Sequence, residues 1–172
     1  LLRISATSLS LTRPGWPALL SAVFVVGLSL ASVLLGGPPS PLPASAPPSA
    51  FSAERAMAHV EQIAQRPHPV GSADHARVRD YLAGAIQQLG LKAEVQSALV
   101  RRGTTTLRMA RVENVMARIR GTQSTGAVML ASHYDSVPAA PGAADAGSGV
   151  AAILEAARAF KTGPAPRNDV IL

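Results

Sequence analysis

The most strongly apolar part of the chain lies near its start. Trp16–Leu35 is a run of twenty residues without a charged side chain. As a helix rising about 1.5 Å per residue it would span about 30 Å, the thickness of a bilayer's hydrocarbon core. A helix that is apolar on all sides needs a surrounding that covers it entirely. We therefore predict that residues 1–35 are a short cytoplasmic stub followed by one transmembrane anchor.

The residues around this helix suggest its orientation. Arg3 and Arg13 precede it and no acidic residue does, which predicts a cytoplasmic N-terminus. Residues 36–50 are rich in Pro, Ser and Ala and lack charge, and we expect them to form an extended, semi-rigid linker. Within this linker, Ala44-Ser45-Ala46 is a possible signal-peptidase site, so a cleaved signal peptide is the alternative to an anchor. Both interpretations place the rest of the chain outside the cytoplasm.

From residue 51 onward, the periodicity is that of a globular domain. Ser52 is a candidate N-cap for a helix over residues 53–65, and Ser72 is one for a second helix over residues 73–89 that ends at Gly90. Between the helices, the prolines on either side of His68 predict a turn.

The following residues alternate as strands do. We predict antiparallel strands over residues 91–100 and 107–119, joined by a turn at residues 101–105. Residues 126–132 are almost wholly apolar, which predicts a central strand covered on both faces. A helix over residues 150–160 and a strand that begins near residue 168 complete an α/β fold, with a mixed central sheet flanked by helices. Because the chain opens with Leu and stops within this strand, we expect a fragment of a longer protein.

Composition narrows the function. The formal charge of +6 comes from scattered arginines, and aromatic residues make up 3% of the chain, so we expect no nucleic-acid partner. There is no cysteine, so any metal must be held by histidine and carboxylate. That ligand set suits catalytic zinc.

The candidate chemistry lies at the end of the apolar strand. His133-Tyr134-Asp135 follows it, and Asp145 comes twelve residues after His133, in a glycine-rich segment before the last helix. We interpret His133 as a zinc ligand and Asp135 as the residue that orients its imidazole. Asp145 can offer one oxygen to each of two metals about 3.5–4 Å apart. A single His-x-Asp often occurs by chance, but the strand, the spacing and the glycines together favour a metal site.

Other polar residues are expected to have structural roles. We predict that His59 and His75 face solvent or cap helices, and that His68 forms a rigid turn packed near the site. Glu155 is expected to pair with Arg158 or to face solvent, and Glu113 to help set a strand edge.

These residues resemble the co-catalytic zinc aminopeptidases, which include bacterial leucyl aminopeptidases and aminopeptidase Y. Membrane-anchored members like the endoplasmic reticulum metallopeptidase are the most similar. The resemblance covers residues 51–172, and its most specific part is the segment from His133 to Glu155. Weaker matches lie at residues 66–72, 79–82 and 112–115. One departure is Ala146, where relatives often have Asn, Asp or Gly.

The resemblance implies that residues 51–172 are the N-terminal part of a zinc exopeptidase domain. In the family's scheme His133 would bind one of two zinc ions, Asp145 would bridge both, and Asp135 would take the supporting catalytic position. The general base and the other ligands follow downstream in this family. We therefore expect an aminopeptidase acting on peptides, anchored to the membrane, with its domain periplasmic, extracellular or lumenal. A fragment without the remaining ligands should be inactive. The alternatives are a non-catalytic ectodomain of this fold and a zinc glutaminyl cyclase.

Overall fold

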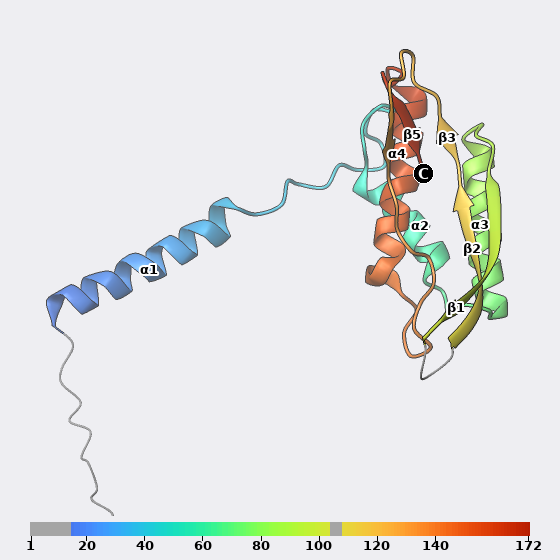
Figure 1. Cartoon of the computed structure of the whole chain (residues 1–172). Coiled ribbons are helices and arrows are strands. Elements are labelled where there is room, and N and C mark those ends of the chain that lie inside the picture. Colours follow the sequence, from blue (N-terminus) through green and yellow to red (C-terminus); the bar gives the residue numbers. More distant parts are fainter. Residues whose placement is uncertain (1–14, 104–107) are drawn as a thin grey trace, which may run out of the picture. The chain divides into compact units, whose positions relative to one another are not determined.

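The computed structural model describes residues 15–103 and 108–172 and divides the chain into two units, Leu1–Ser40 and Pro41–Leu172. In the first unit, helix α1 (Trp16–Leu35) coincides with the predicted apolar segment, and none of its residues is buried (Figure 1). By length and composition it is able to cross a membrane. The predicted stub, with Arg3 and Arg13, lies outside the described residues.

Two capped helices open the second unit. Helix α2 (Ala53–Ile63) begins at Ser52, whose Oγ accepts a hydrogen bond from the N–H of Arg55, 3.2 Å away. Helix α3 (Ala73–Gln88) begins at Ser72, which accepts from the N–H of His75 at 3.0 Å. Both predicted N-caps are confirmed, because a serine oxygen satisfies an N–H that has no partner within its helix.

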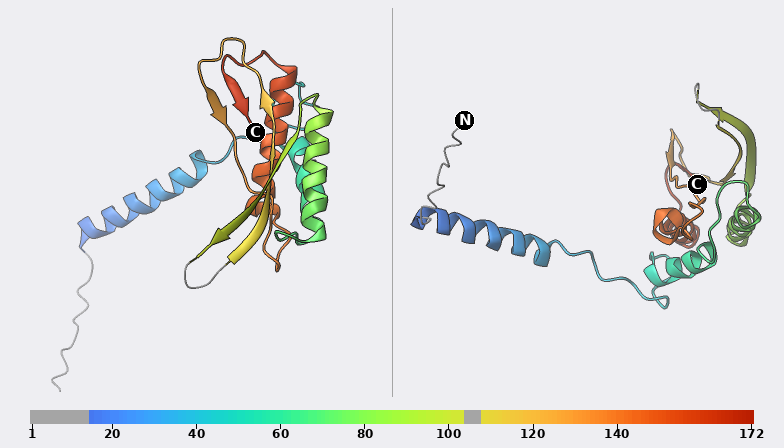
Figure 2. Two further views of the ribbon diagram at one scale, coloured as in Figure 1. Left: turned by 45° about the vertical axis from the view of Figure 1, so that its right-hand side comes forward. Right: turned by 90° about the horizontal axis from the view of Figure 1, so that it is seen from below.

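A two-stranded sheet follows. Strand β1 (Glu94–Arg102) runs antiparallel to β2 (Arg108–Met116), and α3 packs on β2. Figure 2 shows the pair as a long, twisted ribbon. The antiparallel pairing is confirmed. The predicted turn at residues 101–105 is wrong at its start, since Arg101 and Arg102 belong to β1, and its residues 104 and 105 lie outside the described part of the chain.

The second sheet has the order β3-β5-β4 and is mixed, as predicted. Strand β3 (Arg118–Ile119) is antiparallel to β5 (Asp169–Ile171), and β4 (Ala127–Met129) is parallel to it. The prediction of one strand over residues 107–119 is wrong. At Ala117 both backbone groups bond to Leu172, at 3.1 and 2.9 Å, so the chain leaves β1 here and joins the other sheet.

The prediction of a central strand over residues 126–132 is also wrong. Strand β5 occupies the centre of this sheet, and among the described residues β4 pairs with β5 alone. The side chains of Val128 and Met129 are 54% and 63% exposed. An apolar strand is buried only where other segments cover both of its faces and pair with both of its edges. In the described part of the chain, β4 has a neighbouring strand on one edge, so its apolar side chains stay exposed.

Helix α4 (Ser148–Thr162) packs against α2, which also contacts α3. The main core lies where these helices meet β2. Its buried apolar residues are Ile63, Val78, Leu82, Ala85, Ile86, Ala117, Val150 and Leu154. A smaller cluster of Ile119, Ala157 and Val170 joins α4 to the mixed sheet.

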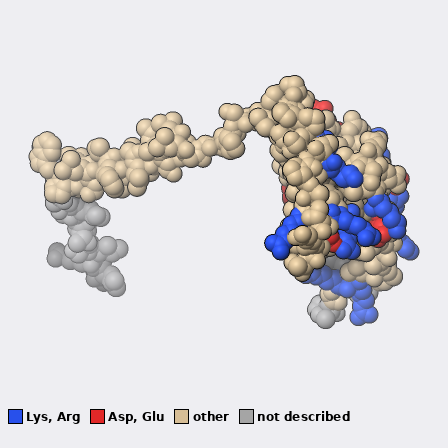
Figure 3. Space-filling view, turned by 90° about the horizontal axis from the view of Figure 1, so that it is seen from above, with Lys and Arg blue, Asp and Glu red and all other residues tan. Residues whose placement is uncertain are grey.

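The linker differs from the predicted extended spacer in its second half. Residues 41–50 belong to the folded unit and form two turns, in which Ala46 N–H bonds to the Pro43 carbonyl at 3.0 Å and Ala50 N–H to the Pro47 carbonyl at 2.9 Å. Figure 3 shows no Lys, Arg, Asp or Glu along the described helix and linker, while Lys and Arg are spread over the visible face of the folded unit. The second half of the linker is therefore folded into turns although it carries no charge.

Candidate metal centre

The structure brings His133 and Asp145 together. His133 lies in the loop after β4, and Asp145 lies in the segment η1 (Ala143–Gly147), where the backbone is kinked at Asp145 and Ala146 before it enters α4. His133 Nε2 is 2.9 Å from Asp145 Oδ1. Both side chains are accessible, with exposed fractions of 52% and 88%. The predicted convergence is therefore present, and the metal-binding role of the two residues stays a prediction.

Asp135 contacts the other ring nitrogen of His133. Its backbone carbonyl lies 3.1 Å from Nδ1, and its carboxylate Oδ1 lies 3.4 Å from the same atom. The sequence predicts that the carboxylate orients the imidazole, whereas the shorter contact belongs to the backbone oxygen. The peptide geometry of the loop thus fixes the ring orientation as much as the Asp135 side chain does.

This environment suits a cation between His133 and Asp145. Both ring nitrogens face acceptor oxygens, and a neutral imidazole has only one N–H to donate. Partial burial lowers the pKa of His133, but the hydrogen bonds to Asp135 and Asp145 outweigh it and raise that pKa above its usual value. A zinc ion at Nε2 would take the place of the second proton.

The separation of the two donor atoms also fits zinc. Ligand bonds of about 2.0–2.2 Å in tetrahedral geometry place two donors about 3.3 Å apart. Nε2 and Oδ1 are 2.9 Å apart, so a shift of a few tenths of an ångström would admit the ion. Within residues 15–103 and 108–172, however, no group of three or more His, Cys, Asp or Glu side chains is arranged to hold a metal ion. The described residues bring two candidate ligands together, His133 and Asp145.

Tyr134 anchors the loop that carries His133. Its hydroxyl donates to the Glu113 carbonyl at 2.8 Å, and its ring stacks on His75 with centroids 4.6 Å apart. Burial, followed by the nearby Glu113 charge, raises the pKa of Tyr134 to about 12, so the hydroxyl stays a donor. Glu113 in turn pairs with Arg79 at 2.8 Å, which ties β2 to α3.

The predictions for two histidines are wrong. His75 is buried rather than solvent-facing, and His59 is half-buried, with Nδ1 2.6 Å from the Tyr81 hydroxyl. Burial lowers the pKa of both histidines. The sequence did contain a pattern that predicts the burial of His75. It precedes Val78 and Leu82 at helical spacing and so lies on the core face of α3.

His68 packs beside the same loop, as predicted. Its backbone N–H donates to Ser136 Oγ at 2.8 Å, and the N–H of Ser136 returns a bond to the His68 carbonyl at 3.3 Å. His68 and Ser136 are both buried. The turn between α2 and α3 therefore holds the residue that follows Asp135.

Glycines allow the loop to close over itself. Gly142 has φ +70°, and a Cβ there would lie 2.8 Å from the Ser136 Cβ. A Cβ at Gly147 would lie 2.8 Å from the Gly142 carbonyl, and one at Gly149 would lie 2.7 Å from Ser132 Oγ. The peptide bond between Asp145 and Ala146 is cis. These close contacts explain why glycine stands at positions 142, 147 and 149.

A cavity of about 470 Å³ adjoins the site. His133 and Asp135 line it, together with Tyr134, His75 and apolar residues of β2, β4 and α4. A predominantly apolar hollow with a few convergent polar groups is the usual form of a small-molecule or peptide-end site.

Known proteins resemble this chain in sequence and in fold. Residues 114–172 match peptidase family M28. The vacuolar membrane protease of Candida albicans (strain WO-1) is 32% identical over 119 residues, which cover 69% of this chain and 14% of the relative. The chain thus spans about a seventh of the length of that relative.

Two solved structures share the fold of the second unit. A glutaminyl cyclase of Porphyromonas gingivalis has a TM-score of 0.61 and 29% identity, covering 71% of this chain and 45% of that one. A Zn-dependent exopeptidase of Parabacteroides distasonis has a TM-score of 0.58 and 30% identity, covering 71% of this chain and 46% of that one. The predicted resemblance to the zinc aminopeptidases is therefore confirmed, at the level of peptidase family M28 and its zinc exopeptidase fold. The Candida albicans relative is by its name a membrane protease, and in this chain α1 is long and apolar enough to cross a membrane.

Proposed function

We propose that this chain carries the first half of the metal centre of a zinc-dependent aminopeptidase. The observation that carries the proposal is the contact between His133 Nε2 and Asp145 Oδ1, 2.9 Å long, inside the segment that matches peptidase family M28. The substrates would be peptides with a free N-terminus, entering the cavity beside His133.

Each residue has a distinct role in this proposal. His133 and Asp145 would hold zinc, and the exposed Asp145 carboxylate leaves its second oxygen free for a second ion. When bound, zinc would supply the Lewis-acid chemistry that activates water and polarises a carbonyl. The Asp135 carbonyl lies 3.1 Å from Nδ1 of His133, which would leave Nε2 for the metal. Tyr134 and His75 hold the loop in register.

The membrane placement completes the proposal. Helix α1 would anchor the chain, and Arg3 and Arg13 before it would keep the N-terminus in the cytoplasm. The peptidase unit would then face the periplasm, the exterior or a lumen. Fusing a reporter that is active in only one compartment to the chain's C-terminus tests this orientation.

A glutaminyl cyclase is a second candidate, favoured by the Porphyromonas gingivalis structure at 29% identity. The two reactions give different products. An aminopeptidase releases the first residue of a peptide, whereas a cyclase acting on N-terminal glutamine releases ammonia and leaves the chain length unchanged. Assaying the full-length gene product on one glutamine-initiated peptide, by mass spectrometry and ammonia detection, separates them. A protein with neither activity would be the non-catalytic ectodomain.

The catalytic role of His133 is tested in the same full-length protein. His133→Ala should lower kcat/KM by at least about 10³-fold, since a lost ligand empties the centre. The matched control is His59→Ala, outside the site, which should retain activity. Equal activity of wild type and His133→Ala would refute the proposal. The 172-residue chain itself should bind zinc weakly and show no turnover. Its described residues bring two ligands together, whereas a catalytic zinc site needs three or more protein ligands.

A further inference from the structure

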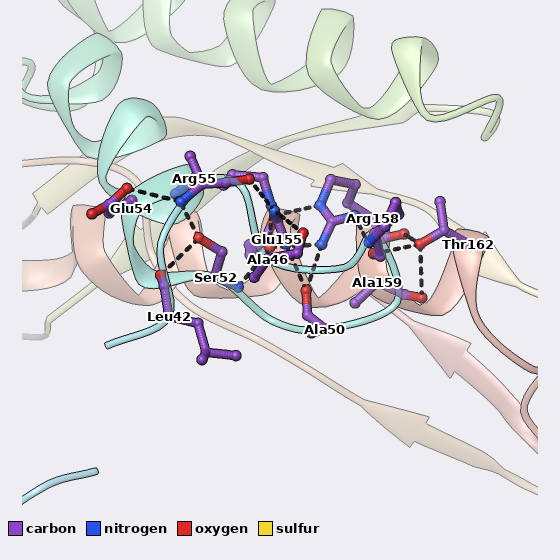
Figure 4. A network of polar contacts seen from close by, with 12 residues as sticks. Leu42, Ala46, Ala50, Ser52, Glu54, Arg55, Glu155, Arg158, Ala159 and Thr162 are labelled. Carbon is purple, nitrogen blue, oxygen red and sulfur yellow. Dashed lines mark hydrogen bonds and ion pairs between the residues drawn. The ribbon is translucent and has the colours of Figure 1, made fainter. Parts of the chain in front are cut away.

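A buried ion cluster lies on α2 and α4, away from the metal centre. Glu155 is fully buried, so its predicted pairing with Arg158 is confirmed and its alternative exposure to solvent is wrong. Its Oε1 accepts from Ser52 N–H at 2.8 Å, from Arg55 Nε at 3.0 Å and from Arg158 Nη2 at 2.7 Å, and Oε2 accepts from Arg158 Nε at 2.6 Å (Figure 4). We call Arg55, Glu155 and Arg158 the arginine clamp.

The terminal Nη groups of Arg55 and Arg158 donate hydrogen bonds to the second half of the linker. Figure 4 shows both guanidinium groups reaching backbone oxygens of the segment that loops over them. The bonds run from Arg55 to the carbonyls of Ala44 (2.5 Å), Ala46 (3.0 Å), Pro47 (3.5 Å) and Ala50 (2.7 Å), and from Arg158 to those of Pro48 and Ala50 (2.8 Å). A fork of charged donors makes strong bonds to oxygen acceptors, so this contact does not depend on side chains in the segment.

Further bonds hold both ends of the same segment. Ser52 Oγ lies within bonding distance of the Leu42 and Pro43 carbonyls, at 3.0 and 2.9 Å. Ala44 N–H donates to Glu54 Oε2 at 2.8 Å, and Thr162 Oγ1 donates to the Pro48 carbonyl at 2.7 Å. Groups from α2, α4 and the α2 N-cap therefore converge on residues 42–50.

We infer that residues 42–50 are an intramolecular strap, locked onto the folded unit by the arginine clamp, which shields the sequence Ala44-Ser45-Ala46 from proteolysis. Proteases bind their substrates as extended strands through backbone hydrogen bonds. In this strap the carbonyls of Ala44 and Ala46 are bonded to Arg55, and the backbone is folded into two turns. The small-residue sequence that would suit a signal peptidase is thereby withheld once the unit has folded.

Hydrogen–deuterium exchange on the full chain in detergent micelles tests the strap. The amides of Ala44, Ala46 and Ala50 should exchange at least about tenfold more slowly than in a synthetic peptide of residues 36–51. In the double variant Arg55→Lys/Arg158→Lys, the charges remain but the forks are lost, and protection should fall about tenfold. Arg101→Lys, in the β1–β2 ribbon, is the matched control and should leave protection unchanged.

Digestion with elastase, which cleaves after small residues, is the second readout. Wild type should resist cleavage between residues 44 and 50 and the double variant should not. Should the double variant fail to fold by circular dichroism, Thr162→Val keeps the test open, because it removes one strap bond from an exposed position and should speed cleavage about threefold. Wild-type exchange or cleavage as fast as in the free peptide, or identical protection in wild type and the folded variants, would overturn the inference.

Discussion

At the level of single residues, the most informative feature is the position of the His133 imidazole between two acceptor oxygens. Its two nitrogens lie 3.1 Å and 2.9 Å from the oxygens of Asp135 and Asp145. A second proton or a bound cation would stabilise an imidazole held between two acceptors. This environment distinguishes His133 from His59, His68 and His75, which are wholly or partly buried among structural contacts.

Replacing the carboxylate partner should weaken zinc binding selectively. Asp145→Asn keeps the shape of the side chain but removes the charge that balances the cation, so we expect zinc affinity to fall at least about tenfold. The measurement is competition with a chromophoric chelator at pH 7.5. Asp80→Asn, a carboxylate on α3 paired with Arg79, is the control. An equal loss in both variants would mean that Asp145 is not a ligand.

Removing the Tyr134 hydroxyl should destabilise the loop without emptying the site. Tyr134→Phe leaves the Glu113 carbonyl without its 2.8 Å donor, which should lower the free energy of unfolding by about 0.5–1.5 kcal/mol. The ring remains stacked on His75. Urea unfolding followed by circular dichroism measures this, with Tyr81→Phe in the same assay to calibrate the loss of a different tyrosine hydroxyl. An unchanged midpoint would show that the bond does not contribute.

At the scale of elements, the glycine-rich approach to α4 is the most constrained segment. Gly142→Ala places a methyl group 2.8 Å from the Ser136 Cβ at φ +70°, which should cost about 2–4 kcal/mol. Gly84→Ala is the matched substitution inside α3, where a Cβ meets nothing within 4 Å. It should stabilise the protein by about 0.5–1 kcal/mol. Denaturant unfolding measures both, and the same sign for the two variants would contradict this account.

Local sequence patterns predicted where helices and strands occur better than they predicted which strands pair with each other. Ser52 and Ser72 marked helix starts, and the apolar run marked α1, because capping and periodicity act within a few residues. The break at Ala117 could not be found this way, since it depends on hydrogen bonds to Leu172, 55 positions along the chain. The exposure of β4 likewise depends on which strands lie beside it.

The candidate site followed the same division. Spacing and glycines pointed to His133 and Asp145, whereas the orientation of the ring by the Asp135 backbone carbonyl was invisible in the sequence. The strap could not be predicted, because its composition is typical of a free spacer. Arg55 and Arg158 bind its backbone carbonyl oxygens, which every residue has, so no sequence pattern indicates the contact.

At the scale of the whole molecule, stability should depend on acidic pH through Glu155. Burial favours the neutral acid, but hydrogen bonds from Arg158, Ser52 and Arg55 outweigh this and lower the pKa of Glu155 below its usual 4.5. A carboxyl with a lowered folded pKa contributes stability that is present above the unfolded pKa and is lost as pH falls through the folded one. Unfolding free energy should therefore decline below about pH 4.5.

Neutralising this carboxyl gives a direct check. Glu155→Gln should lower the free energy of unfolding at pH 7 by about 3–5 kcal/mol. The substitution leaves the largely buried guanidinium groups of Arg55 and Arg158 without their counter-charge. Its stability should then fall less steeply in acid than that of wild type. Glu61→Gln, on the exposed face of α2, should follow the wild-type curve. Parallel acid limbs in wild type and Glu155→Gln would refute the assignment.

Zinc K-edge X-ray absorption on the zinc-loaded chain shows whether His133 binds the metal. We expect one imidazole nitrogen at about 2.0–2.1 Å, oxygen as the remaining ligands, and loss of the imidazole scattering in His133→Ala. His68→Ala serves as the comparison and should keep it. An unchanged imidazole signal in His133→Ala would show that zinc binds elsewhere, and the assignment of this site would be wrong.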